Sequence, residues 1–283
     1  MTDSNNSTGD PSSSPDPTDL LASLDRITAL LAGGRVGLFL DIDGTLAPIQ
    51  EDPFTVAITP AVRDAIATLA RLMTVVAISG RSVQSSYAIV GVDGITYVGN
   101  HGSQWLRDGV GRLLPEAEPF VAEARQIAEA GRAALGHIPG VIVEGKGTSV
   151  SLHYRATADR AAAARAIDDF IRDTPGTERF VRIEGKLIVD LRPAIDVSKG
   201  TALASLVSSE GMRNVLVLGD DTTDIDGFVA LRGLRDAGQV DGLAIAVRSE
   251  GTQAAVLDAA DHTLASVEAV GEFLTWLVAQ TGG

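Results

Sequence analysis

The stretch that decides the fold is VGLFL at 36–40, followed directly by DIDGTLAPI at 41–49. A short apolar run that stops at charged residues predicts a strand buried on both faces, as in a parallel sheet. Ligands of such sheets bind beyond the carboxyl ends of the strands. Asp41 and Asp43 are two residues apart, so in extended chain their side chains point the same way. Converging carboxylates repel each other unless a cation lies between them or one is protonated. The simpler alternative is that Asp-x-Asp-Gly forms only a turn, without a binding site.

A second acidic segment follows a second apolar run. NVLVLGD at 214–220 predicts another buried strand, and GDDTTDID at 219–226 places a group of carboxylates at its end. These carboxylates belong to Asp220, Asp221, Asp224 and Asp226. Such a group is costly unless a divalent metal neutralises part of it, and oxygen ligands without His or Cys favour magnesium. A solvated acidic loop, or acids that serve a helix N-terminus, is the alternative interpretation.

Two weaker signals concern phosphate. In ISGRS at 78–82, Ser79 and the N–H groups after it, beginning at Gly80, could hold a phosphate oxygen at a helix N-terminus. Lys199 precedes a predicted helix in DVSKG. Taken alone, the first segment is more often a plain turn, and a single lysine is more often a surface residue.

The order of predicted elements indicates two kinds of structure. Strands at 36–40, 74–79, 95–99, 214–220, 242–247 and 262–265, with helices at 20–31, 60–72, 199–208 and 267–280, predict a doubly wound, mainly parallel α/β core. Helices at 118–135 and 157–172, with hairpins at 141–155 and 180–193, predict a separate α+β layer. We therefore expect a core at 19–102 and 193–283 and an inserted layer at 103–192. The polar residues 1–18 are expected to form a disordered tail.

Composition limits the possible partners. The chain has 283 residues, 45% of them hydrophobic, and a formal charge of −14, so it is expected to bind neither nucleic acid nor anionic membranes in general. It contains no cysteine, which excludes disulfides and thiolate zinc sites. The start of the sequence lacks the cationic and apolar regions of a secretory signal, and no apolar run approaches the roughly 20 residues of a membrane span. We therefore expect a cytoplasmic protein.

The combination of motifs resembles a known superfamily. DxDGT, then Ser, then Lys, then GDDxxD is the order of the haloacid-dehalogenase-like phosphatases, and the insert lies where their C2-type cap lies. The chain is further similar to trehalose-6-phosphate phosphatases over roughly 35–275. The segments that carry this similarity are DIDGTLAPI, SGR (79–81), YVGNHG (97–102), VEGKGTSVSLHYR (143–155), DLRP (190–193), KG (199–200) and GDDTTDIDGF (219–228). Asp190 stands where that family often has Glu.

The resemblance implies a mechanism. Asp41 is implied as the nucleophile that forms an aspartyl-phosphate, and Asp43 as general acid and then base. The phosphoryl oxygens would be bound by Thr45, Ser79, Gly80 and Lys199. Magnesium would be held by Asp41, the backbone carbonyl of Asp43 and Asp220, with Asp221 and Asp224 completing or orienting the shell.

The resemblance also implies that the cap selects the sugar, because the core contacts mainly the phosphate. The polar residues on the predicted cap hairpins are Glu144, Lys146, His153, Arg155, Glu184 and Lys186. For any one of them, a solvated strand face is an equally good interpretation. The implied substrate is trehalose 6-phosphate. Two alternatives are a phosphatase of another sugar phosphate, such as a sucrose-like or glycosylglycerate phosphate, and a non-catalytic sugar-phosphate sensor.

Overall fold

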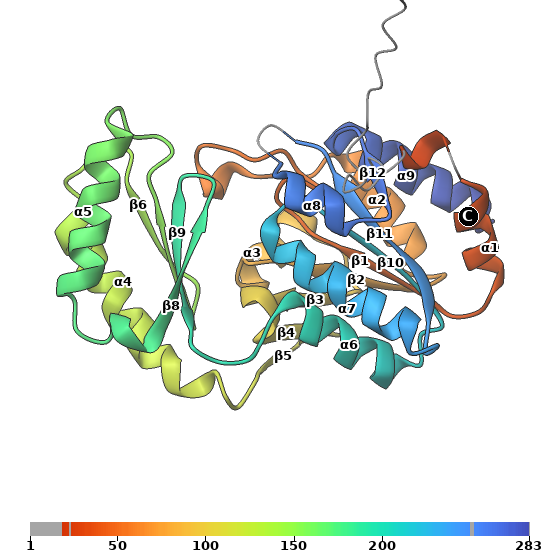
Figure 1. Ribbon diagram of the computed structural model, residues 1–283, viewed down its shortest axis with the longest axis horizontal. Coiled ribbons are helices and arrows are strands. Elements are labelled where there is room, and N and C mark those ends of the chain that lie inside the picture. Colours follow the sequence, from red (N-terminus) through yellow and green to blue (C-terminus); the bar gives the residue numbers. More distant parts are fainter. Residues whose placement is uncertain (1–18, 23, 250–251, 283) are drawn as a thin grey trace, which may run out of the picture.

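The structure is a computed structural model, and it describes residues 19–22, 24–249 and 252–282 (Figure 1). The predicted tail at 1–18 lies outside the described residues. Two lobes lie side by side in Figure 1, a larger one at the right and a smaller one, coloured mainly green, at the left. Each lobe is built on a sheet of its own. Among the described helices, none combines the length and the hydropathy needed to cross a membrane.

The larger lobe contains an eight-stranded sheet in the order β12-β11-β10-β1-β2-β3-β4-β5. Its strands are β1 (Val36–Leu40), β2 (Thr74–Ile78), β3 (Thr96–Gly99), β4 (Gln104–Arg107), β5 (Val110–Leu113), β10 (Asn214–Gly219), β11 (Asp241–Val247) and β12 (His262–Leu264). The pairs from β12 through to β3 are parallel, and only β4 and β5 run antiparallel to their neighbours. Strands β2 to β5 follow β1 in sequence and lie on one side of it, whereas β11 and β12 follow β10 and lie on the opposite side of β10. The strand order therefore reverses between β1 and β10.

Helices cover both faces of this sheet. They are α1 (Asp25–Ala32), α2 (Pro60–Leu69), α3 (Val83–Val90), α6 (Lys199–Glu210), α7 (Ile225–Asp236), α8 (Ala254–Ala259) and α9 (Val267–Gln280). Side chains alternate along each strand: Leu38 and Leu40 pack with α1, α2 and α9, whereas Phe39 packs with α6 and α7. All of β1 is therefore buried, which explains why its sequence is a continuous apolar run.

The smaller lobe has a separate antiparallel sheet in the order β6-β7-β9-β8. Its elements are β6 (Ile142–Gly145), β7 (Val150–His153), β8 (Phe180–Gly185) and β9 (Ile188–Pro193), with the helices α4 (Val121–Leu135) and α5 (Arg160–Asp173). The two helices pack on one face of the sheet around a hydrophobic cluster of their own. Phe120 and Phe180 meet edge to face in this cluster, with ring centroids 5.4 Å apart.

Short 3-10 helices complete the described elements: η1 (Leu20–Ala22), η2 (Pro53–Thr55), η3 (Asn100–Gly102), η4 (Glu118–Phe120), η5 (Thr177–Arg179) and η6 (Thr222–Asp224). The predicted helix at 118–135 thus begins as η4 and continues as α4. The predicted helix at 20–31 is likewise divided between η1 and α1, and α2 ends at Leu69, three residues before its predicted end.

The predicted fold class is confirmed: a doubly wound, mainly parallel core stands beside a separate α+β layer. One segment differs from the prediction. Residues 104–113, which were expected in the inserted layer, form the β4–β5 hairpin and extend the large sheet. The reason is the tight reversal at Asn100 and His101, whose φ angles of 46° and 56° turn the chain back against β3. The helices α3, α7 and α8 were also missing from the prediction.

We predict that Leu38→Ala will lower the free energy of unfolding by about 2–5 kcal/mol, because it removes a fully buried side chain from the central strand. Chemical denaturation followed by circular dichroism measures this change. Val229→Ala is the matched control, since Val229 is 55% exposed and its truncation should stay within about 0.5 kcal/mol. Equal losses in the two variants would contradict the assignment of β1 to the centre of the core.

Candidate active site

The two acidic segments meet because their strands are neighbours. Leu40 of β1 pairs in register with Leu218 of β10, and the N–H of Asp41 donates to the carbonyl of Leu218 at 3.1 Å. Asp41 and Asp220 therefore leave the sheet side by side, at the point where the strand order reverses. Gly44 makes this approach possible: its φ is +81°, and a Cβ there would lie 2.1 Å from Oδ2 of Asp220.

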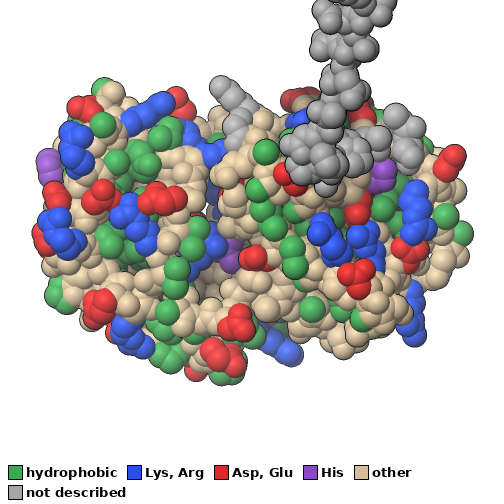
Figure 2. Space-filling model, viewed as in Figure 1, with side chains coloured by type: hydrophobic (Ala, Val, Ile, Leu, Met, Phe, Trp, Pro, Cys, Tyr) green, Lys and Arg blue, Asp and Glu red, His purple; other side chains and the backbone are tan. Residues whose placement is uncertain are grey.

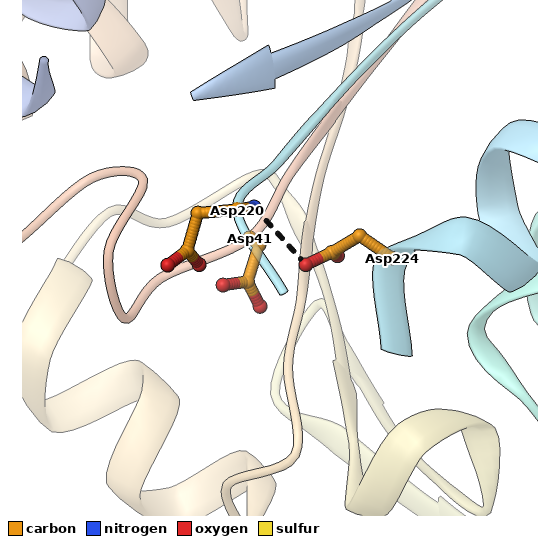
Figure 3. A group of neighbouring side chains, drawn as sticks. All are labelled: Asp41, Asp220 and Asp224. Carbon is orange, nitrogen blue, oxygen red and sulfur yellow. Dashed lines mark hydrogen bonds between the residues drawn. The ribbon is translucent and has the colours of Figure 1, made fainter. Parts of the chain in front are cut away.

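Three carboxylates converge at this point (Figure 3). Asp41, Asp220 and Asp224 are all buried and each offers one oxygen, and these oxygens lie within 4.8 Å of one another. Burial raises the pKa of Asp41 well above its ordinary value, opposed by Lys199 and reinforced by Asp224 and Asp220. Burial and the neighbouring Asp224 also raise the pKa of Asp220, to about 7. The cluster thus carries more negative charge than its surroundings balance.

Lys199 supplies the cation at the centre of this group. Its Nζ donates to Oδ1 of Asp41 at 2.6 Å and to Oδ1 of Asp224 at 2.7 Å. Burial opposes the charge of this lysine, but Asp224 and Asp41 outweigh that effect, so the pKa of Lys199 is raised and the ammonium stays charged. Ser198 caps the N-terminus of α6 and so places Lys199 in its first turn, facing the sheet edge.

Asp224 and Asp220 use their oxygens differently. Oδ2 of Asp224 accepts from the N–H groups of Asp220 at 3.2 Å and Asp221 at 3.1 Å, so this carboxylate also holds the loop after β10. Oδ1 of Asp220 is buried and accepts no hydrogen bond from the described residues. A buried carboxylate oxygen without a donor, beside two further carboxylates, fits a divalent cation that prefers oxygen ligands.

Asp43 has a partner that the sequence interpretation missed. Nε and Nη2 of Arg81 donate to the two oxygens of Asp43, each at 2.7 Å. Nη1 of Arg81 donates to the carbonyl of Pro53 at 2.8 Å, and the arginine is only 6% exposed. Arg81 stands in the quoted SGR motif, so its position was a signal, but nothing in the motif says that its partner is Asp43.

The predicted phosphate-binding residues lie close to these carboxylates. Ser79 and Gly80 follow β2 and line the same cavity as Asp41. The hydroxyl of Ser79 accepts from the N–H of Arg81 at 3.2 Å. Thr45 is fully buried, and its hydroxyl has no hydrogen-bond partner among the described residues. It lies behind the cavity surface rather than on it.

The cavity lies between the two lobes, where Figure 2 shows a hollow bordered by Lys, Arg and His side chains. Asp41, Asp43, Asp220 and Lys199 form its core wall. All six polar residues predicted on the cap hairpins line the opposite wall: Glu144, Lys146, His153, Arg155, Glu184 and Lys186. Asp221, from the core, also lines the cavity, whereas Asp224 lies below the cavity surface.

Two polar pairs lie on the cap wall. Glu144 contacts His153 at 2.9 Å, and Nζ of Lys146 lies 3.6 Å from Oδ1 of Asp190. Burial disfavours the charge of Asp190, but Lys146 and Arg192 outweigh it and hold the pKa of Asp190 well below its usual range. Glu184 is different, because it is exposed and pairs with Arg182 at 2.7 Å.

Three further polar residues of the cavity, His101, Asp190 and Arg192, were not among the predicted ones. His101 stands on the reversal after β3, and its Nε2 lies 3.9 Å from Oδ2 of Asp190. Burial and the nearby Arg192 hold the pKa of His101 well below its usual range, so the imidazole is neutral at pH 7. Gly80 is needed here, since a Cβ would lie 2.4 Å from the His101 ring. Asp190 and Arg192 were quoted only as part of a motif.

Comparison with known proteins identifies the family of the chain. The family model described as "Trehalose-phosphatase" matches residues 39–261. The chain belongs to the trehalose-phosphatase family. It is 37% identical over 231 residues to the trehalose-phosphate phosphatase of Mycolicibacterium paratuberculosis, covering 77% of this chain and 56% of that protein. It is 35% identical to the Mycobacterium leprae protein of the same name, covering 94% of this chain and 62% of that one. The chain thus spans little more than half the length of these family members.

Solved structures show the same fold. A trehalose-6-phosphate phosphatase related protein superposes with a TM-score of 0.70 at 25% identity, over 86% of this chain and 97% of that one. The C-terminal domain of the Candida albicans trehalose-6-phosphate phosphatase superposes with a TM-score of 0.76 at 21% identity, over 93% and 98%. Membership of the trehalose-phosphatase family therefore rests on sequence and on fold together.

We predict that Asp220 lowers the free energy of unfolding of the metal-free protein, and that this effect depends on pH. Its carboxyl ionises near pH 7 when folded but near 3.8 when unfolded, so folding favours the protonated form. The stability of the wild type relative to Asp220→Asn should therefore fall as pH rises from about 4 to above 7, by about 1–4 kcal/mol in total. Urea denaturation of both proteins in chelator at pH 5 and pH 8 measures this. A difference that is the same at both pH values would refute the raised pKa.

Proposed function

We propose that this member of the trehalose-phosphatase family hydrolyses trehalose 6-phosphate to trehalose and phosphate. The observation that carries the proposal is a buried nucleophile candidate, Asp41, which opens into a cavity whose far wall is polar. Lys199 and Ser79 lie beside Asp41 and suit a phosphoryl group, and the cap wall suits the hydroxyls of a sugar. The similar proteins named above are trehalose-phosphate phosphatases, which supports this choice of substrate.

The proposed reaction has two steps on Asp41. In the first, a carboxylate oxygen of Asp41 attacks phosphorus in line, the phosphorus–sugar oxygen bond breaks, and Asp43 gives a proton to the departing sugar oxygen. In the second, Asp43 takes a proton from water, which attacks phosphorus and releases the carboxylate of Asp41. Lys199 neutralises charge throughout, because its ammonium lies 2.6 Å from Asp41.

Arg81 has a consequence for the acid step. Arg81 donates once to each oxygen of Asp43, and each of these oxygens has a second lone pair that can take a proton. We therefore propose that Arg81 orients Asp43 while Asp43 gives a proton to the leaving oxygen and later takes one from water.

Magnesium is the cation that we propose for the acidic cluster. Asp41, the carbonyl of Asp43 and Asp220 would hold it, with Asp221 and Asp224 supporting them. When bound, it would neutralise charge on the phosphoryl group and on the carboxylates. Asp224 supports the cluster through hydrogen bonds within the protein, because its two oxygens accept from Lys199 and from the N–H groups that follow β10.

The two lobes divide the work in this proposal. We propose that the larger lobe is the catalytic core and that the smaller one, broadly the 103–192 insert without its β4–β5 hairpin, is a cap that reads the sugar. Lys146, Asp190 and Glu144 are the cap groups best placed for this, because all three are charged groups on the cavity wall, with Lys146 and Glu144 buried and the side chain of Asp190 only 14% exposed. Buried charged groups that a substrate satisfies discriminate strongly against ligands that leave them unpaired.

The direct test is phosphate release from a panel of sugar phosphates. Trehalose 6-phosphate should give the highest kcat/KM, and Asp41→Asn should fold normally yet lose nearly all turnover, because an amide cannot form the acyl phosphate. Circular dichroism controls for folding. A higher kcat/KM for a sucrose-like or glycosylglycerate phosphate would replace the substrate. No phosphate release from any member, with binding retained, would instead favour a sensor, and full turnover by Asp41→Asn would refute the nucleophile.

A second test separates the work of the cap from that of the core. Lys146→Ala and Glu144→Gln remove or weaken hydrogen bonds to sugar, worth about 1.5–3 kcal/mol each when one partner is charged. They should lower kcat/KM for trehalose 6-phosphate by about 10- to 150-fold and leave a small generic phosphate ester nearly unchanged. Lys199→Ala should damage both substrates together. Equal losses on both substrates in the cap variants would mean that the cap does not read the sugar.

A further inference from the structure

The turn between β8 and β9 brings a cap lysine to the metal-site cluster of the core. Lys186 stands at this turn, followed by Leu187 in a left-handed conformation with φ +59°. Nζ of Lys186 lies 3.4 Å from Oδ2 of Asp220 and 3.2 Å from Oγ of Ser249. The side chain is 23% exposed, whereas that of Asp220 is only 1% exposed. A charged group of the cap thus touches one of the three clustered carboxylates.

Ser249 completes this contact from the core side. It follows β11, and its Oγ donates to the same oxygen, Oδ2 of Asp220, at 3.2 Å. Thr252 fixes the serine in turn, since its Oγ1 accepts from the N–H of Ser249 at 2.8 Å. Oδ2 of Asp220 therefore has two donors, from two different lobes. Oδ1 of the same carboxylate is buried and has none among the described residues.

The approach of Lys186 is anchored through its backbone. Nη2 of Arg155 donates to the carbonyl of Lys186 at 2.6 Å, and Nη1 of the same arginine donates to the carbonyl of Gln50 at 2.6 Å. One guanidinium thus joins the cap turn to the loop that follows β1. The lysine is therefore held at Asp220 by its main chain as well as by its side chain, which distinguishes it from a freely moving surface lysine.

We propose that Ser249 and Lys186 are positioning residues that orient Asp220 for the divalent cation. By holding Oδ2, they leave Oδ1 as the oxygen that is free to bind the metal. Hydrogen bonds to the outer atoms of metal ligands commonly set affinity in this way. The cap thereby takes part in the metal site as well as in reading the sugar. This inference rests on the metal site of the proposed function.

The test is the affinity of the protein for Mg²⁺ alone, measured by isothermal titration calorimetry without substrate. Ser249→Ala and Lys186→Met should each weaken Mg²⁺ binding by about 10- to 100-fold. Because the two donors hold one oxygen, the double variant should lose little more than the weaker-binding single variant. Ser249→Thr keeps the hydroxyl and should restore binding towards that of the wild type, which a general disturbance of the loop would not do.

Two matched control variants distinguish the loss of a direct contact with Asp220 from the general loss of a charge or a hydroxyl near the site. Lys146→Met removes the same charge from the same cavity, but Lys146 contacts Asp190 and none of the three clustered carboxylates. Ser85→Ala removes a hydroxyl that contacts Arg81 on the Asp43 side of the site. Both controls should bind Mg²⁺ like the wild type. Thermal unfolding in chelator checks that every variant is folded before titration.

The outcomes are distinct. Unchanged or tighter Mg²⁺ binding by Ser249→Ala and Lys186→Met would overturn the inference, and tighter binding by Lys186→Met would show a lysine that competes with the metal. An equal loss in Lys146→Met would also overturn it, because charge alone would then explain the effect. A wild type that binds no Mg²⁺ would contradict the metal site itself, whereas normal wild-type binding with unaffected variants would leave the proposed function standing.

Discussion

The contacts of Lys199 with Asp41 and Asp224 are the interaction on which the site depends. Three carboxylates are buried together at the ends of β1 and β10, and buried like charges are stable only when cations or protons offset them. The lysine offsets part of this charge from the first turn of α6. Burial and the charge that the lysine leaves uncompensated raise the pKa of both Asp41 and Asp220, and the unpartnered oxygen of Asp220 indicates a place for a divalent cation.

The sheet explains why this charge can be assembled at all. β1 and β10 are neighbours in space although the cap separates them in sequence, and the strand order reverses between them. Their carboxyl ends therefore open onto a crevice that no crossover helix fills. Apolar side chains on both faces hold these strands rigidly, so Asp41 and Asp220 are positioned by the core rather than by flexible loops.

Two of the polar contacts between the cap and the core bear directly on the proposed site. One is the network around Asp190, where Lys146, Arg192 and the neutral His101 surround a largely buried carboxylate that lines the cavity. The other is the contact of Lys186 with Asp220, next to the proposed metal. In the proposed function, a sugar phosphate bound between the lobes would touch the first group with its hydroxyls and the core cluster with its phosphate, so one cavity would serve both recognition and chemistry.

The sequence by itself determined the strands β1 and β10, the acidic segments that follow them, Lys199 at the start of α6 and the alternation of the cap hairpins. These features are local: they depend on apolar runs, caps and spacing within a few residues. Only the tertiary structure decided that Arg81 pairs with Asp43, that residues 104–113 extend the core sheet, and that Lys186 and Ser249 meet at Asp220. These contacts join side chains separated by 38, 34 and 29 positions. Their partners are set by how strands and lobes pack in space, which no local pattern of the chain encodes.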